Sequence, residues 1–339
     1  MPLKIEVLEL IRIMTLRRIF NILKITITFY FSRLMKKVFH KGMPLAISFE
    51  PTNCCNLRCP ECLSGAGELQ RSEGNASYEF FSSLIDQIHR ETFYLNMYFQ
   101  GEPFLNPYFF RMIEYASQKN IFVSSSTNGH YLSENNCHSL INSGLKKITV
   151  SLDGSTQDVY EKYRVGGKME KVLSGLKLLV QKRKELKRRF PVIVIQFLVF
   201  KYNEHQINEI RVLSKEIGVD RLELKSAQIY HDEKMGELMP ANPAYSRYKE
   251  NKDGSYSLKN RPFNHCWRSW HSCVLTWDGL LLPCCFDKKG EYAFASLKDN
   301  KFEKIWKSNE FNHFRYQLLK SRLEIDICKN CTEGKNFFI

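Results

Sequence analysis

Between residues 45 and 224, short apolar runs alternate with amphipathic stretches, and this alternation constrains the fold more than any other feature of the sequence. The apolar runs are 45–49, 95–99, 121–125, 147–152, 192–200 and 221–224. Stretches of helical periodicity lie between them at 78–90, 107–119, 133–142 and 204–217. Strands that alternate with helices usually form a parallel sheet with crossover helices. The pattern therefore predicts an α/β fold, a partial (β/α)6 barrel of the TIM type.

The loops after the expected strands contain the residues best suited to chemistry. In order along the chain they are Cys55, Cys59 and Cys62, then Gly101-Glu102-Pro103, then Thr127-Asn128-Gly129, then Ser151-Leu152-Asp153-Gly154. In a barrel of parallel strands, the loops at the carboxyl ends meet at one face and carry the active site. We therefore expect these four loops to converge.

The first loop has the cysteine spacing of an iron-sulfur site. Cys55, Cys59 and Cys62 are separated by three and then two residues. Three thiolates in this arrangement can bind three corners of a cubane [4Fe-4S] cluster and leave the fourth iron open. A zinc site is the alternative, but such sites close with a fourth Cys or His at short spacing, and none soon follows Cys62.

The segment Cys55-Asn-Leu-Arg-Cys59-Pro-Glu-Cys62 resembles the signature of the radical S-adenosylmethionine (SAM) enzymes, and the resemblance extends over residues 45–339. It implies that the amine and carboxylate of SAM chelate the open iron. One electron, from an external donor such as flavodoxin or ferredoxin, then cleaves SAM to methionine and a 5′-deoxyadenosyl radical. That radical abstracts hydrogen from a substrate.

The resemblance also implies a SAM-binding set. Gly101, Glu102 and Pro103 are similar to the motif that receives the methionyl amine, and Arg164 resembles the arginine that binds the carboxylate. Hydrogen bonds to the nucleoside and methionine are implied for Asn128, Ser151 and Asp153. Each of these residues taken alone is also typical of turns.

Two positions depart from the family pattern. Gln100 stands where a glycine usually precedes the Gly-Glu-Pro motif, so the backbone there has less freedom. Glu61 stands where many relatives have an aromatic residue that packs on adenine. We therefore expect adenine to contact another wall.

The C-terminal cysteines form a second motif. Cys266, Cys284, Cys328 and Cys331 resemble the auxiliary-cluster module called SPASM or, in its shorter form, twitch. The resemblance implies one auxiliary [4Fe-4S] cluster bound by four thiolates. A structural zinc site with the same ligands stays open as an alternative. Within this module we expect a hairpin at 274–283 with an Asp278-Gly279 turn, and a helix at 302–319.

Cys285 follows a proposed ligand directly and is a candidate catalytic residue, either a hydrogen donor or a thiol that faces the substrate. Sulfatase-maturating relatives have an acid at this position. A small buried hydrophobe or a replacement ligand is the alternative. We interpret Cys54, Cys137 and Cys273 as structural. The eleven cysteines are clustered and odd in number, which indicates metal binding in a reducing compartment rather than disulfides.

The net charge of +14 is confined to two segments, 1–41 and 168–189, each with nine Lys or Arg and two Glu. The second segment has helical periodicity and ends in basic residues, where the helix dipole favours cations. This is typical of a solvated helix end and disfavours nucleic-acid binding.

The N-terminal segment mixes apolar and basic residues. Its longest uncharged run near the apolar centre, 25–32, is too short to span a bilayer. The segment therefore either lies on an anionic membrane surface or packs on the domain that follows. No secretory signal is visible, so we expect a cytoplasmic protein, in the first case at the inner face of the membrane.

We divide the chain into a basic helical segment (1–44), a radical SAM core (45–235), a connector (236–265) and an auxiliary-cluster domain (266–339). The first functional hypothesis is oxidation of a peptide side chain; the second is modification of a sugar, lipid or other small metabolite. The short segment before the first strand leaves no room for the leader-peptide-binding domain of many peptide maturases. A third hypothesis is a non-enzymatic, metal-stabilised binding protein. Under this hypothesis the Gly-Glu-Pro and Thr-Asn-Gly loops would match the family pattern only by chance.

Overall fold

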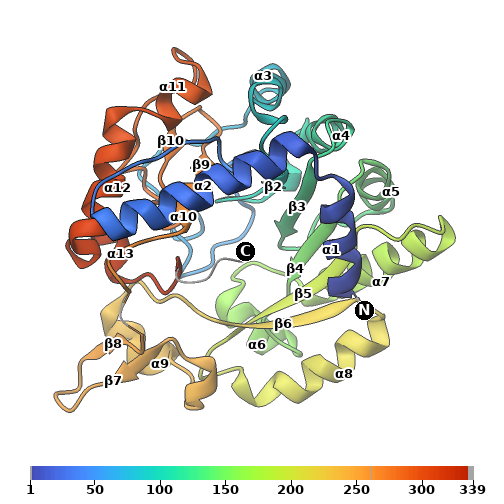
Figure 1. The fold of residues 1–339 in the computed structure, drawn as a ribbon. Helices are drawn as coiled ribbons and strands as arrows, with labels where there is room; N and C mark the ends of the chain where they lie inside the picture. The colour runs from blue at the N-terminus through green and yellow to red at the C-terminus, as the bar shows by residue number, and fades with distance from the viewer. Residues whose placement is uncertain (1, 261, 335–339) are drawn as a thin grey trace.

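The computed structural model describes residues 2–260 and 262–334, and one eight-stranded sheet organises them (Figure 1). The strand order is β10-β9-β1-β2-β3-β4-β5-β6. The six expected strands are present and parallel to their neighbours: β1 (Ala46–Phe49), β2 (Tyr94–Asn96), β3 (Phe122–Thr127), β4 (Lys147–Ser151), β5 (Val192–Val199) and β6 (Arg221–Ser226). The predicted α/β class is confirmed.

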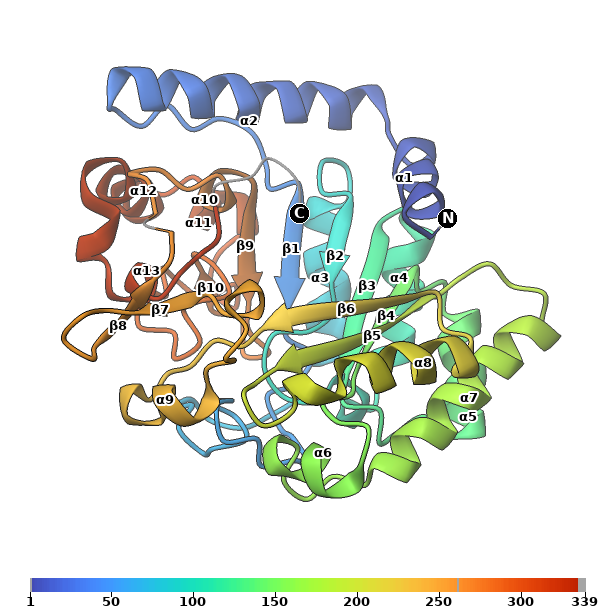
Figure 2. The same cartoon turned by 90° about the horizontal axis from the view of Figure 1, so that it is seen from below.

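Helices follow the strands, and all of those named next except α6, which lies beyond the strand ends, cover the outer face of the curved sheet (Figure 2). They are α3 (Tyr78–Ile88), α4 (Phe109–Gln118), α5 (Glu134–Asn142), α6 (Gln157–Tyr163), α7 (Met169–Glu185) and α8 (Ile207–Ile217). Serine N-caps start two of them, because the side chains of Ser77 and Ser133 accept from the backbone N–H groups of Phe80 and Asn136. Gly218, at φ +81°, ends α8.

Side chains alternate between the two faces of the strands, as the two-residue repeat of a strand requires. Apolar residues such as Leu95, Val123 and Ile148 face the helices and form the main core. Their neighbours Asn96 and Ser124 face the barrel interior and line a chamber. The sheet thus has a dry outer face and a polar inner face.

The C-terminal module joins the same sheet. Strand β9 (Ser272–Leu275) pairs in parallel with β1, and β10 (Leu281–Leu282) returns antiparallel to β9. The expected hairpin is therefore present but extends the main sheet. The single helix expected at 302–319 is wrong: the structure has α11 (Phe302–Trp306) and α12 (Asn309–Ser321), because Ser308 caps a new helix by accepting from Phe311 N.

Short elements complete the C-terminal half. The region expected as a connector holds the two-stranded sheet of β7 (Tyr248–Glu250) and β8 (Tyr256–Leu258), just after α9 (Met235–Leu238). Helices α10 (Arg268–His271) and α13 (Asp326–Lys329) flank the cysteine-bearing loops of the last module.

The basic N-terminal segment forms α1 (Pro2–Arg12) and α2 (Leu16–Met35). One face of α2 packs on the C-terminal module, where the Phe29 ring lies 5.1 Å from Trp267 and 5.3 Å from Trp270 between centroids. Buried Arg18 donates to backbone carbonyls of residues 13, 89, 92 and 120. Packing on the following domain, one of the two expectations, is thus confirmed for this face. None of the helices in residues 2–260 and 262–334 has the length and apolar character needed to cross a bilayer.

Candidate functional site

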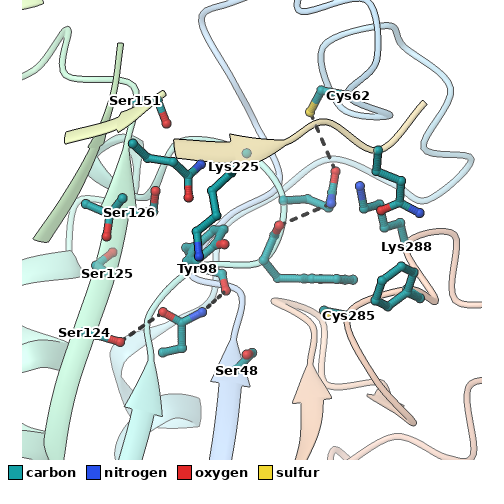
Figure 3. A pocket seen from close by; sticks show the side chains of 18 of the residues that line it. Ser48, Cys62, Tyr98, Ser124, Ser125, Ser126, Ser151, Lys225, Cys285 and Lys288 are labelled. Atoms are coloured by element: carbon teal, nitrogen blue, oxygen red, sulfur yellow. Dashed lines mark hydrogen bonds between the residues drawn. The ribbon is translucent and has the colours of Figure 1, made fainter. Parts of the chain in front are cut away.

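A chamber of about 820 Å³ lies between the inner face of the barrel and the C-terminal module (Figure 3). It brings together most of the residues predicted from the sequence: Cys55, Cys59, Cys62, Gly101, Glu102, Asn128, Ser151, Arg164 and Cys285 all line it. The four loops therefore converge as expected. Pro103 and Asp153 lie behind this lining, as do the four C-terminal cysteines.

The three-cysteine loop presents thiols to polar donors. Arg164 Nη1 donates to Cys59 Sγ at 3.7 Å, and Leu57 N donates to Cys55 Sγ at 3.5 Å. Burial raises the pKa of Cys55 to about 11, against the lowering effect of the Leu57 N–H. A metal must therefore displace the protons for these groups to act as thiolates. Three thiols on one loop, with a guanidinium at one of them, fit the donor set of a [4Fe-4S] cluster with one open iron.

A buried ion pair holds this loop to the rest of the molecule. Arg71 donates to both carboxylate oxygens of Glu50, at 2.9 and 2.7 Å, and its Nε donates to the Lys288 carbonyl at 3.1 Å. Trp277 N also donates to Glu50, at 3.3 Å. The pair thus ties the cysteine loop to the end of β1 and to the C-terminal module. Sequence reasoning missed both residues, because a lone Glu and a lone Arg 21 positions apart carry no local pattern.

Glu102 joins two of the predicted loops. Its carboxylate is 1% exposed and accepts from Thr127 Oγ1 at 2.7 Å, Asn128 N at 2.7 Å and Phe104 N at 3.3 Å. Burial raises the pKa of Glu102 to about 7, although the hydrogen bonds act to lower it. A positive charge placed next to this carboxyl would stabilise its ionised form at neutral pH.

The backbone beside Glu102 requires its glycine. Gly101 has φ +74°, and an added Cβ would lie 2.6 Å from the Thr52 carbonyl oxygen. The preceding residue, Gln100, places Oε1 at 3.9 Å from Cys62 Sγ and 3.4 Å from Ser64 Oγ. The departure from the family pattern therefore puts an amide beside the third cysteine.

Asp153 orients Arg164. Asp153 Oδ2 accepts from Arg164 Nε at 2.6 Å, and Oδ1 accepts from Leu198 N at 2.6 Å. Both oxygens are therefore engaged by protein donors, and the side chain is fully buried. Burial acts to lower the pKa of Arg164, but the charges of Asp153 and Cys59 hold it well above its usual value. Arg164 thus presents a fixed positive charge next to the cysteine loop.

Glu61 lines the chamber, but protein donors engage its carboxylate. Its carboxylate is buried and accepts from Tyr230 N at 2.8 Å, and it lies 3.0 Å from His231 Nδ1. The hydrogen bond with Glu61 raises the pKa of His231. The residue that replaces the aromatic side chain of many relatives therefore fastens the cysteine loop to the segment after β6.

The four C-terminal cysteines form a second thiol cluster. Cys266, Cys328 and Cys331 are buried. Burial raises the pKa of Cys284, and the neighbouring thiols of residues 285, 331 and 266 raise it further, which places all of them within electrostatic reach. Arg322 Nη2 donates to Cys331 Sγ at 3.2 Å. This guanidinium, which the sequence did not single out, places a positive charge beside Cys331.

No group of three His, Cys, Asp or Glu side chains in residues 2–260 and 262–334 is arranged to hold a single metal ion. A tetrahedral zinc site needs every donor about 2–2.3 Å from one point. In a cubane, each thiolate binds a different iron, so its ligands stand farther apart. The two groups of cysteine thiols therefore need not surround a single point in order to bind a cluster.

Cys285 faces the chamber, whereas its neighbour Cys284 does not line it. Figure 3 shows Cys285 close to Lys288. The structure thus places this thiol on the chamber wall, and its role toward a substrate stays a prediction. Cys137 and Cys273 are buried in the main core.

The barrel interior adds polar residues that the sequence reading did not single out. They are Asn96, Ser124, Thr149, Gln196, Glu223 and Lys225, and all line the chamber. Ser124 Oγ donates to Asn96 Oδ1 at 3.1 Å, as drawn in Figure 3. A signal was available for two strands, since polar residues alternate with apolar ones along β4 and β6.

Comparison with known proteins agrees with this arrangement. Residues 49–213 match the family model of the radical SAM superfamily, and residues 266–332 match that of the iron-sulfur cluster-binding domain SPASM. The mycofactocin maturase MftC of Mycobacterium tuberculosis is 28% identical over 183 residues, 53% of this chain and 44% of that protein. The chain thus matches less than half the length of this relative. A tungsten-containing aldehyde ferredoxin oxidoreductase cofactor-modifying protein of Pyrococcus furiosus is 25% identical over 300 residues, 79% of this chain and 82% of that protein.

Two solved structures share the fold. Streptococcus suis SuiB bound to its precursor peptide SuiA has a TM-score of 0.61 at 14% identity, covering 90% of this chain and 74% of that one. BtrN in complex with AdoMet and 2-DOIA has a TM-score of 0.52 at 17% identity, covering 87% of this chain and 95% of that one. At these identities the likeness concerns the fold alone.

Proposed function

Because the chain belongs to the radical SAM superfamily and carries a SPASM domain, which binds auxiliary iron-sulfur clusters, we propose that it performs radical chemistry on a substrate held in the chamber. The observation that carries this proposal is the convergence of the cysteine loop with Glu102 and Arg164 on one space. When bound, the [4Fe-4S] cluster supplies the electron that cleaves SAM to methionine and a 5′-deoxyadenosyl radical, which then takes hydrogen from the substrate.

The residues around the chamber divide the binding of SAM between them. Cys55, Cys59 and Cys62 hold the cluster. The Glu102 carboxylate, deprived of water, is suited to the methionyl ammonium, and the adjacent Gly101 allows close approach. Arg164, fixed by Asp153, is suited to the carboxylate. Asn128 and Ser151 line the chamber with hydrogen-bonding groups suited to the nucleoside.

The C-terminal module supplies the opposite wall. Cys266, Cys284, Cys328 and Cys331 would hold one auxiliary [4Fe-4S] cluster, which would supply a second redox centre beside the substrate. Cys285 extends from this wall into the chamber and contacts the substrate there. An external flavodoxin or ferredoxin supplies the first electron.

Oxidation of a peptide side chain is the first substrate class. The names of the relatives support it: one is a maturase, and SuiB was solved with a precursor peptide. The polar interior favours a second class, a sugar or other small polar metabolite. Asn96, Gln196 and Lys225 offer several donors and acceptors below the radical site, and such groups orient hydroxylated ligands.

Anaerobic reconstitution tests the chemistry. Incubation with iron and sulfide, then SAM and a reductant, should give about eight irons per chain and 5′-deoxyadenosine. Cys55→Ala should lose that product, whereas Cys54→Ala, a change at the adjacent cysteine outside the ligand set, should retain it. Zinc in place of iron, or intact iron without cleavage, would contradict the proposal.

Deuterium transfer separates the two substrate classes. Deuterated peptides and deuterated sugars are supplied separately, and the label in 5′-deoxyadenosine is read by mass spectrometry. Label from peptides alone supports the first class, and label from sugars alone supports the second.

A further inference from the structure

The N-terminal helices carry an apolar surface that the fold leaves uncovered. Along α2 we define the outer stripe as Leu16, Phe20, Leu23, Ile27 and Leu34, all of them exposed. Leu16, Ile27 and Leu34 are 75%, 64% and 78% exposed. On α1, Leu3, Val7 and Ile11 continue the exposed apolar series at spacings of four. Such a concentration of large apolar side chains on one surface marks an interaction site.

The outer stripe lies opposite the packed face of α2. The buried residues of this helix are Arg18, Asn21, Ile25, Phe29 and Ser32. With 3.6 residues per turn, these positions and the outer stripe fall on opposite sides of the helix. Figure 2 shows α2 as the outermost element at the end of the sheet from which β1 and β9 begin. The outer stripe therefore points away from the molecule.

The charged residues of these helices are also divided between an inner and an outer side. Both acidic residues of the segment turn inward: Glu6 pairs with Arg221 at 3.0 Å, and Glu9 pairs with Lys146 at 2.7 Å. The basic residues Lys4, Lys24, Arg33, Lys36 and Lys37 remain exposed. On α2, Lys24 and Arg33 lie on either side of the outer stripe, as the helical repeat places them. The outer surface is therefore apolar at its centre and positive at its margins.

We propose that α1 and α2 bind the headgroup region of an anionic membrane, with the outer stripe of α2 inserted among the lipid chains. An apolar face bordered by Lys and Arg is the pattern of interfacial helices. Anionic lipids complement the exposed cations. A second copy of this chain would bring two positive surfaces together, which like-charge repulsion disfavours. This proposal does not depend on the reaction of the chamber, whose cysteine loop lies at the far ends of the strands.

Vesicle sedimentation of the reconstituted protein provides the test. Vesicles of phosphatidylcholine with one quarter phosphatidylglycerol should bind it about tenfold or more tightly than phosphatidylcholine alone. The double variant Leu23→Glu/Ile27→Glu should lose about tenfold or more in binding, and so should Lys24→Glu/Lys36→Glu. Val212→Glu, at an exposed apolar position of α8, is the matched control and should bind as the unchanged protein does.

Three outcomes would overturn the proposal. Equal binding to both vesicle types would remove the electrostatic component. Loss of binding in the lysine variant but not in the Leu23/Ile27 variant would mean adsorption by charge alone. A dimer in light scattering that Leu23→Glu/Ile27→Glu dissociates, without vesicle binding, would assign the stripe to a protein interface. Thermal unfolding and 5′-deoxyadenosine formation, measured in parallel, separate these outcomes from misfolding and from failure of the radical chemistry.

Discussion

Glu102→Gln should remove the pH-dependent destabilisation that the Glu102 charge causes and weaken the binding of SAM, and these two effects make it the most informative substitution. The buried Glu102 carboxyl has its pKa raised from 4.5 to about 7. Glutamine resembles the protonated acid in shape and carries no charge. The variant therefore keeps the side-chain volume and removes the charge that burial destabilises.

The sign and size follow from linkage. A carboxyl with a raised pKa in the folded state binds protons that the unfolded state has released, so stability decreases as pH rises from about 4.5 to about 7. At about 1.4 kcal/mol per pH unit, the Glu102 charge lowers stability by roughly 3 kcal/mol above pH 7. Between pH 5 and pH 8, the Glu102→Gln variant should gain about 2–3 kcal/mol relative to the unchanged chain.

Urea unfolding of the metal-free, reduced chain at several pH values measures this difference, because contributions common to both proteins cancel. Calorimetry on the reconstituted protein should show SAM binding weakened by about 10- to 100-fold, since a charge-assisted hydrogen bond contributes about 1.5–3 kcal/mol. A difference in stability that is constant with pH would refute the raised pKa. Unchanged SAM affinity would refute the contact with the ammonium.

Further substitutions test the supports of the site. Arg71→Ala should destabilise the fold by about 3–5 kcal/mol in urea unfolding, because it leaves the buried Glu50 unpaired; a loss below 1 kcal/mol would contradict this. Gly101→Ala should lower stability and iron content much more than Gly67→Ala, since both have φ +74° but only the first added Cβ meets backbone atoms; equal effects would count against the close approach. Cys328→Ser should lose about four irons per chain and keep the first cluster by iron analysis, and loss of all iron would exclude two independent sites.

Local pattern was sufficient to predict the strands and the order of the motifs. Apolar runs and strand-helix alternation predicted β1 to β6, and the loops after them met at one face because parallel strands end on the same side. The predicted thiol Cys59 lines the chamber for this reason, whereas Cys285 follows the antiparallel strand β10 and reaches the chamber from the C-terminal module. Pairing of β9 with β1 could not be predicted, since 222 residues separate their ends and no local signal marks the partner.

Long-range polar contacts were also invisible in the sequence. From the sequence, Glu61 stood out only as the replacement for an aromatic residue that packs on adenine in many relatives. In the structure it forms hydrogen bonds with Tyr230 and His231. Asp153 was predicted to form hydrogen bonds with SAM, and the sequence did not show that both of its oxygens also accept from protein donors. Contacts of this kind depend on which segments the fold brings together, and sequence spacing does not encode that.

We propose an open iron beside Cys55, Cys59 and Cys62, and resonance spectroscopy of the reduced protein can detect SAM bound to it. SAM labelled with ¹⁵N at the methionyl amine is added to the reconstituted protein, and electron-nuclear double resonance is recorded. A nitrogen coupling to the cluster, weakened or lost in Glu102→Gln, is the expected result. A spectrum that SAM does not alter, in a protein with full iron content, would contradict the binding of SAM to an open iron.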